Sequence, residues 1–128
     1  MSIQDMSIIR ERRVGTPSIG PLKPAVFQML LAIAGRAGHG YAIMQAVAEQ
    51  SGRQVTLRTG SFYRHLTRLL DDGLVEAVER PAHADARRGD YYRLTPLGHR
   101  VLAQERERLA ALMATIKGLP PAPRRGRA

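Results

Sequence analysis

The sequence of 128 residues contains neither cysteine nor tryptophan, and it has no long apolar run. Without cysteine the chain has no disulfide framework, no thiolate zinc site and no cysteine nucleophile, and the absence fits a reducing cytoplasm. A membrane-spanning helix needs roughly 20 apolar residues, which no segment approaches. The opening residues, MSIQDMSIIRERR, lack the basic start, apolar stretch and cleavage site of a signal peptide. We therefore expect a cytoplasmic protein with one compact domain.

Residue patterns that are typical of active sites are also missing. The four histidines fall in separate parts of the sequence, without paired carboxylates around them (His39, His65, His83 and His99). No Ser/His/Asp set and no glycine-rich phosphate loop stands out. A metal sensor would need clustered ligands, which this spacing does not supply. We expect no enzyme activity, no cofactor and no metal site.

Positive charge is in excess and is unevenly distributed. Lys and Arg number 20 against 11 for Asp and Glu, which gives a formal net charge of +9. An acid-free run holds four arginines, and the C-terminal tail holds three more (Arg53, Arg58, Arg64 and Arg68; Arg124, Arg125 and Arg127). Such a protein is biased towards polyanions, of which nucleic acid is the common one. A solvated basic surface is the plainer alternative.

Apolar periodicity predicts three short helices, a hairpin and one long helix. The expected elements are helices over 24–34, 41–50 and 60–72, strands over 74–80 and 90–94, and a helix over 96–117. A short strand is expected over 54–57. Residues 1–21 mix Ser, Gly, Pro and charges, so we expect an irregular arm with a short helix at Ser7–Arg13.

Single residues mark the ends of these elements. Thr59 is expected to cap the third helix, and Gly73 to end it. Thr95 and Pro96 are expected to open the final helix. Tyr41 is placed on the apolar side of the second helix.

Three helices followed by a hairpin form the layout of a winged helix-turn-helix, so the fold class is mainly α (α+β). The third helix then enters the DNA major groove, and the hairpin tip reaches the neighbouring backbone or minor groove. Arg64 and Arg68 are four residues apart and share a face with Thr67. The plainer alternative is a solvated face on which these arginines pair with Asp71 or Asp72. The predicted DNA-binding residues are Arg58, Thr59, Ser61, Tyr63, Arg64, Thr67, Arg68, Arg87 and Arg88.

Three segments in combination resemble the PadR family of transcriptional regulators: HGYAIMQAV, TGSFYRHLTRLLDDGLVEA and RRGDYYRLTPLGHRVL. The resemblance covers roughly residues 22–117 and matches the short subfamily, which has one helix after the wing. It implies a bacterial, homodimeric DNA-binding regulator that is usually a repressor. It also implies that Ser61, Tyr63, Arg64 and Arg68 face DNA, whereas Tyr41 has a mainly structural role. Phe62 stands where family members often have Leu.

Some members of this family release DNA when a small molecule binds. The resemblance thus implies a possible effector pocket between the first helix and the final helices of the dimer, lined by Phe27, Leu109 and Met113. Members that stack drugs between tryptophans use a mode that this chain lacks, because it has no Trp.

The final helix carries an apolar stripe with heptad spacing, interrupted by Glu105. We expect this stripe to form a homodimer interface through Leu102, Leu109, Leu112, Met113 and Ile116, although packing on its own domain is the alternative. The expected organisation is an arm over 1–21, a DNA-binding domain over 22–94, a dimerisation helix over 95–118 and a basic tail over 119–128.

A dimer would place two recognition helices in successive major grooves of double-stranded DNA, which predicts a pseudo-palindromic site. Two other functions remain open on the residues alone. One is a sequence-tolerant architectural or accessory nucleic-acid-binding protein, with the basic tail as an anchor. The other is a winged helix that is used for protein contacts, which the arginine face disfavours.

Overall fold

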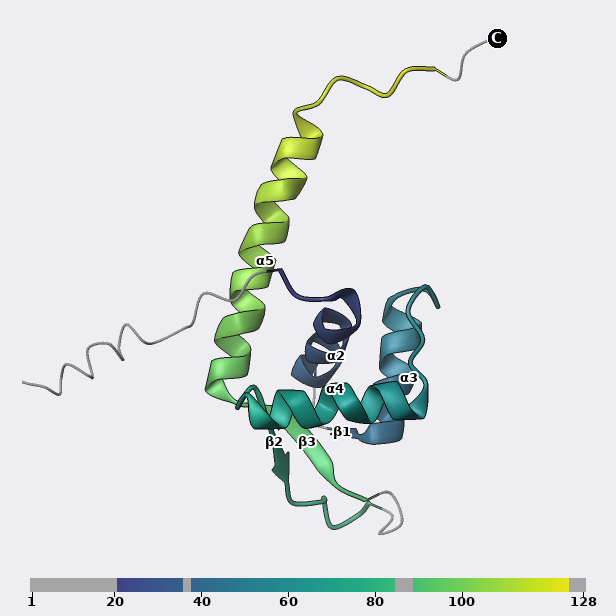
Figure 1. Cartoon of the computed structure of the whole chain (residues 1–128), viewed down its shortest axis with the longest axis vertical. Coiled ribbons are helices and arrows are strands. Elements are labelled where there is room, and N and C mark those ends of the chain that lie inside the picture. Colours follow the sequence, from purple (N-terminus) through teal and green to yellow (C-terminus); the bar gives the residue numbers. More distant parts are fainter. Residues whose placement is uncertain (1–20, 36–37, 85–88, 125–128) are drawn as a thin grey trace, which may run out of the picture.

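The computed structural model describes residues 21–35, 38–84 and 89–124. Within these ranges the element order is α2 (Pro24–Gly35), β1 (Gly38–His39), α3 (Gly40–Gln50), α4 (Thr59–Asp71), β2 (Val75–Val78), β3 (Tyr91–Leu94) and α5 (Pro96–Lys117). Helices α2, α3 and α4 gather beside the small sheet, and α5 runs past them and projects well beyond (Figure 1). The predicted mainly helical fold with a β hairpin is confirmed.

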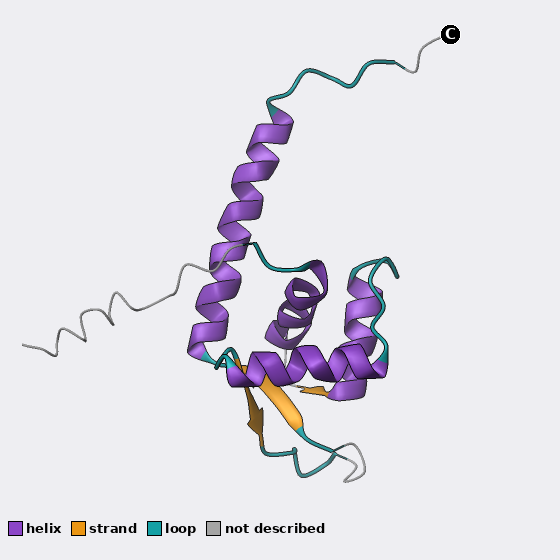
Figure 2. Ribbon diagram, in the orientation of Figure 1, coloured by secondary structure: helices purple, strands orange, loops and turns teal. Residues whose placement is uncertain are grey.

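The sheet has three antiparallel strands with β3 in the centre, in the order β1-β3-β2. Val75 lies opposite Leu94 and Val78 lies opposite Tyr91, so β2 and β3 form the predicted hairpin, which points away from the helices (Figure 2). The third strand, β1, was not predicted. This strand has only two residues, which pair with Tyr91 and Tyr92 of β3. Because these partners are far away in the sequence, local periodicity cannot indicate the pairing.

The core lies between the three short helices and the inner face of the sheet. Its largest fully buried side chains come from α2, α3 and α4: Met29, Leu30, Ile33, Val47, Phe62 and Leu66. Helix α5 adds Val101 near its beginning. Most of the distal half of α5 therefore contributes nothing to this core.

The junction between α4, the hairpin and α5 depends on Thr95 and two glycines. Gly73 adopts φ of 76°, a left-handed conformation that favours glycine, and α4 ends there as predicted. The Thr95 hydroxyl donates to the carbonyl oxygen of Gly73 at 2.6 Å and accepts from the backbone N–H of Gly98 at 3.0 Å. With Pro96 in the first turn, Thr95 thus caps α5 as predicted and also ties it to the end of α4.

Three local predictions were wrong. Residues 54–57 form no strand, because Ser51 Oγ accepts from the backbone N–H of Val55 at 3.0 Å, so this group does not need a strand partner. Thr59 is the first residue of α4 rather than its cap, and Arg58 in the cap position makes no side-chain capping bond. Tyr41 is 55% exposed, stacked beside the His39 ring instead of entering the core.

In the part of the chain that the structure describes, no helix combines the length and the apolar character needed to cross a membrane.

Gly98 lies directly against the backbone of Leu74, where a β-carbon would collide with the Leu74 carbonyl oxygen. We expect Gly98→Ala to lower the free energy of unfolding by roughly 1–3 kcal/mol, because a backbone atom held in a hydrogen bond cannot move aside. Urea denaturation followed by circular dichroism measures the change. Gly35→Ala is the matched control, since nothing lies within 4 Å of a β-carbon there. Equal stability of the two variants would contradict the close approach.

Candidate nucleic-acid interface

Helix α4 separates buried apolar residues from exposed polar ones. Phe62, Leu66 and Leu69 are buried in the core. The opposite side exposes the residues that the sequence analysis placed at the DNA surface: Thr59, Tyr63, Arg64, Thr67 and Arg68, with Ser61 half-buried beside them. Burial of one face therefore forces the other to face solvent.

The two arginines of α4 are held only by exposed contacts. Arg64 Nη2 donates to Ser61 Oγ at 3.1 Å. Arg68 Nε lies 3.6 Å from a carboxylate oxygen of Asp72, and the two side chains are 77% and 53% exposed. Contacts this exposed contribute little to stability, so each guanidinium group can leave its present partner and bind an anion instead.

Tyr63 connects α4 to the beginning of α3. Its ring lies edge-on to Phe62, with centroids 4.8 Å apart. Its hydroxyl occupies the space beside Gly40, where an added β-carbon would lie 2.5 Å from the hydroxyl oxygen, so a larger residue there would displace the Tyr63 side chain. Next to it, His39 Nδ1 accepts from the backbone N–H of Ala42 at 3.1 Å and caps α3. The His-Gly pair thus fixes the spacing of the two helices.

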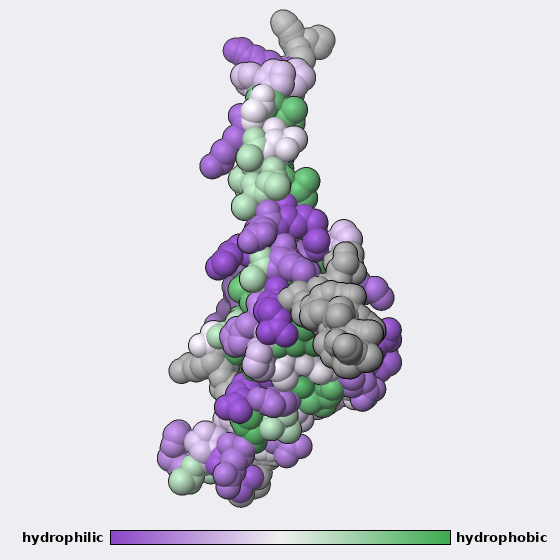
Figure 3. Space-filling view, turned by 90° about the vertical axis from the view of Figure 1, so that its left-hand side faces the viewer, coloured by the Kyte–Doolittle hydropathy of each residue, from purple (hydrophilic) through white to green (hydrophobic). Residues whose placement is uncertain are grey.

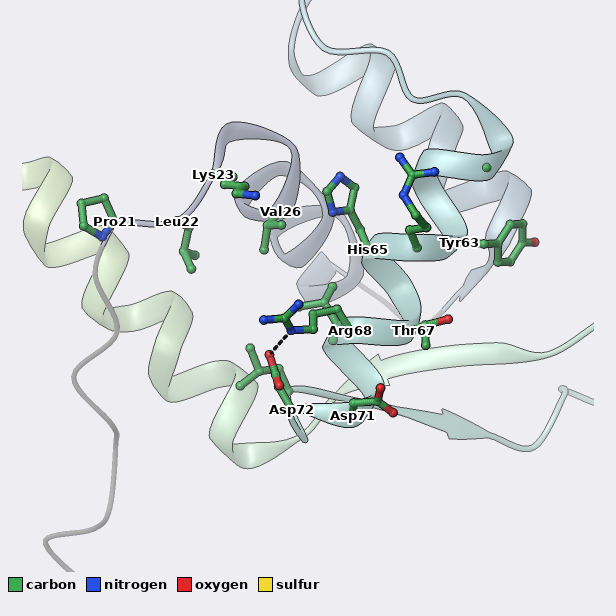
Figure 4. A pocket seen from close by; sticks show the side chains of 14 residues that line it. Pro21, Leu22, Lys23, Val26, Tyr63, His65, Thr67, Arg68, Asp71 and Asp72 are labelled. Atoms are coloured by element: carbon green, nitrogen blue, oxygen red, sulfur yellow. Dashed lines mark ion pairs between the residues drawn. The ribbon is translucent and has the colours of Figure 1, made fainter.

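A groove of about 870 Å³ runs along the outer side of α4. Its other wall is the chain just before and at the beginning of α2, where Pro21, Leu22 and Lys23 lie opposite Arg68 and His65 (Figure 4). Sequence reasoning missed Lys23, because no local pattern connects it with a helix that begins 36 residues later.

The hairpin lies against the C-terminal part of the same surface. Arg87 and Arg88, the predicted contacts of its tip, lie outside the described residues. In the strands, Arg93 Nε is 2.8 Å from Glu76 Oε2, so this arginine is already paired across the strands. Tyr92 is buried and Tyr91 is half-buried, so Tyr92 is the one that faces the core. Burial raises the pKa of Tyr92, as do Asp90 and Tyr63, so the phenol stays neutral.

The distal part of α5 exposes a continuous apolar stripe. Its members on the helix are Leu109, Leu112, Met113 and Ile116, and Leu119 follows just beyond the end of α5; these side chains are between 42% and 60% exposed. Apolar, green surface is visible on the projecting part of this helix (Figure 3). Leu102, the remaining residue of the predicted interface, is half-buried against its own core. Glu105, which interrupts the heptad spacing, is only 6% exposed and pairs with Arg108.

A second, smaller cavity of about 380 Å³ lies between α2 and α5. Phe27 and Leu109, two of the three predicted pocket residues, line it together with Leu31, His99, Leu102, Ala103 and Arg106. Met113 is one helical turn further along α5 and is not part of the lining. The cavity is thus mainly apolar with two polar side chains at its edge. Among the described residues, no three His, Asp or Glu side chains converge as metal ligands.

Comparison with known proteins gives a clear assignment. Residues 29–104 match the Transcriptional regulator PadR-like family, which is more than half of the chain. The chain belongs to this family. The match indicates a DNA-binding transcriptional regulator, in agreement with the exposed arginines of α4. None of the curated proteins compared with the chain matches it significantly.

Several solved structures have the same fold. A PadR-like transcriptional regulator from Bacillus cereus aligns with a TM-score of 0.64 at 19% identity, over 77% of this chain and 93% of that one. A PadR-like transcription factor from Bacteroides fragilis gives 0.56 at 22% identity, over 89% and 96%. RosR from H. salinarum gives 0.55 at 23% identity, over 78% and 97%. At these identities the similarity shows the winged-helix fold alone.

Proposed function

We propose that this PadR-family protein is a sequence-specific transcriptional regulator of the cytoplasm that acts as a homodimeric repressor. The observation that carries the proposal is the exposed face of α4, where Arg64, Thr67 and Arg68 have no role in the core. In this arrangement α4 enters the major groove of double-stranded DNA, and the guanidinium groups pair with guanine edges in bidentate fashion.

Contacts to phosphate orient α4 on the duplex. Arg58 makes no capping bond, so the first backbone N–H groups of α4 remain available for an anion. Thr59, Ser61 and Tyr63 add hydroxyl groups near the same end of the helix, and Arg87 and Arg88 of the wing grip the adjacent backbone.

Removal of both arginines tests this assignment. We expect the double substitution Arg64→Ala and Arg68→Ala to weaken binding to DNA from upstream of the protein's own gene by at least about 30-fold, because each bidentate pair contributes roughly 1–3 kcal/mol. Fluorescence anisotropy across a salt series, with a scrambled fragment alongside, measures the loss. Arg100→Ala with Lys117→Ala removes the same charge from α5 and should leave specific binding nearly intact.

The wild-type measurement separates the two main functions. A preference of about a thousandfold for the upstream fragment, persisting as salt rises, supports a specific repressor. Equal affinity for both fragments, lost together with salt, supports the sequence-tolerant architectural alternative. Full-strength binding by the α4 double variant would show that α4 is not the recognition helix.

The apolar stripe of α5 supports a homodimer. Four large apolar side chains on one face of α5, with Leu119 just beyond its end, are costly in water, and the described part of the chain leaves them 42% to 60% exposed. A second copy supplies an identical stripe, which a twofold axis makes self-complementary. The same axis would set two α4 helices in successive major grooves of a pseudo-palindromic site.

Glutamates in the stripe should break the dimer. We expect Leu112→Glu with Ile116→Glu to give a monomer in sedimentation equilibrium, because four like charges would be buried across the twofold axis. Ala111→Glu with Ala114→Glu adds the same charges to the opposite face of α5 and should remain dimeric. A dimer in both variants would place the interface elsewhere.

The cavity between α2 and α5 supports release of DNA by a small-molecule effector. Its apolar lining suits the body of an apolar molecule, and His99 and Arg106 suit a polar or anionic group on it. A ligand there would contact both α2 of the DNA-binding domain and the helix of the dimer interface. It would thus change the relative position of the two α4 helices.

Filling the cavity tests the effector site with 8-anilinonaphthalene-1-sulfonate as the probe. We expect saturable fluorescence enhancement with wild type, competition between dye and DNA, and loss of dye binding in Ala103→Trp, because the indole occupies the cavity. Ala114→Trp, an exposed position about three helical turns beyond Ala103 and outside the cavity lining, should bind dye as wild type does. Dye binding that is unchanged by Ala103→Trp, or indifferent to DNA, would count against the site.

A further inference from the structure

Gly40 is buried at the beginning of α3, and its backbone does not account for a glycine at this position. It is not among the described glycines that have a positive φ, so other residues could adopt its conformation. Alanine would also favour the helix more than glycine does. The reason for the glycine must therefore lie in what surrounds it.

Side chains of α4 fill the space into which a β-carbon on Gly40 would point. That atom would lie 2.5 Å from the Tyr63 hydroxyl oxygen, 3.3 Å from Tyr63 Cζ and 3.2 Å from Phe62 Cε2. Phe62 is fully buried in the core, whereas Tyr63 is 45% exposed and has solvent to turn into. When a side chain is added at Gly40, the ring that moves is therefore that of Tyr63.

Tyr63 leaves α4 on the side away from the groove described above. Figure 4 shows its ring directed away from His65 and Arg68, and its hydroxyl lies beside the first residue of α3. The ring packs edge-on against Phe62, with centroids 4.8 Å apart. Phe62 and Gly40 thus hold the Tyr63 ring at the boundary between the exposed face of α4 and the beginning of α3.

A hydroxyl contacts a phosphate only from a narrow range of positions. The two oxygen atoms of such a hydrogen bond lie about 2.7 Å apart. A change of rotamer turns the Tyr63 ring by about 120° around the Cα–Cβ bond, which takes the hydroxyl at the far end of the ring out of this range. A contact between Tyr63 and DNA therefore depends on the rotamer that the neighbouring residues permit.

We propose that Gly40 is a positioning residue for DNA binding and that it acts through Tyr63. Because Gly40 has no side chain, the Tyr63 ring stays packed at the beginning of α3, where its hydroxyl donates to a phosphate oxygen beside α4. Gly40 itself makes no contact with DNA. This inference rests on the proposed binding of DNA by α4, and it concerns affinity rather than sequence preference, because phosphates carry no base information.

A double-mutant cycle in the full-length protein tests whether the two residues act as one unit. Fluorescence anisotropy measures binding to the upstream fragment and to a mixed-sequence duplex of the same length. We expect Tyr63→Phe to weaken binding to both by about 10-fold, because a hydrogen bond to a charged oxygen is lost. Gly40→Ala should weaken binding by a similar factor, because it displaces the same hydroxyl. In the Tyr63→Phe background, Gly40→Ala should change the affinity by less than about 2-fold.

Salt dependence distinguishes a displaced Tyr63 side chain from a displaced α4. The slope of log K against log salt counts the contacts between cationic side chains and phosphates. Gly40→Ala should keep both the wild-type slope and the wild-type preference for the upstream fragment, because Arg64 and Arg68 remain in place. A shift of the whole helix would lower both.

Gly38→Ala is the matched control. A β-carbon there meets only ordinary contacts, 3.7 Å from Ala42 Cβ and 3.9 Å from Ile43 Cγ1, so this variant should bind DNA as wild type does. Thermal unfolding followed by circular dichroism confirms that each variant folds. If Gly40→Ala alone does not fold, the double variant, which lacks the colliding hydroxyl, should still fold and bind DNA as Tyr63→Phe does. A double variant that also fails to fold rejects the inference.

Three further results would overturn the inference and leave the proposed function standing, provided that binding is still lost in the Arg64→Ala and Arg68→Ala protein. They are full affinity of either single variant, an equal loss from Gly40→Ala with and without the Tyr63 hydroxyl, and a lower salt slope in Gly40→Ala. No binding of either duplex by wild type rejects the proposed function as well.

Discussion

Burial of the apolar face of α4 is the constraint on which the rest of the surface depends. Phe62 and Leu66 are among the largest fully buried side chains, and they come from the helix that also carries the exposed arginines. Because side chains three and four residues apart share a face, burying Phe62 and Leu66 directs Arg64 and Arg68 outwards. The same contacts that stabilise the core therefore determine how α4 presents its polar face.

Two close approaches at glycines hold α4 in place. At its beginning, Gly40 leaves room for the Tyr63 hydroxyl; at its end, Gly98 lies against Leu74 while Thr95 bonds to Gly73. The Gly98 approach excludes even one methyl group because its neighbour is the Leu74 backbone, whereas the Gly40 approach is to the side chains of Tyr63 and Phe62. A rigid connection of this kind would transmit a shift of α5 to the helix proposed to read DNA.

Helix α5 separates two chemically different regions. Its first half packs on the core and carries the buried Glu105, which pairs with Arg108, and its second half has an apolar side that the described part of the chain leaves largely exposed. The cavity lined by Phe27 and Leu109 lies where these halves meet. The proposed DNA surface lies at one end of the molecule, the apolar stripe at the other and the cavity between them, an arrangement that is consistent with the proposed regulation by an effector.

Periodicity and end signals in the sequence were sufficient for the helices, the hairpin, the Thr95 cap and the buried face of α4. Each of these depends on residues within a few positions of one another. Four features could not be derived in this way: strand β1, the exposure of Tyr41, the irregular segment 54–57 in which Val55 bonds to Ser51, and the position of Lys23 in the groove. Strand β1 and the position of Lys23 depend on partners that are close in space but distant in the chain, and only packing of the elements brings those partners together. Tyr41 and the Ser51–Val55 bond have local partners, but apolar periodicity does not indicate a ring stack or a side-chain bond to the backbone.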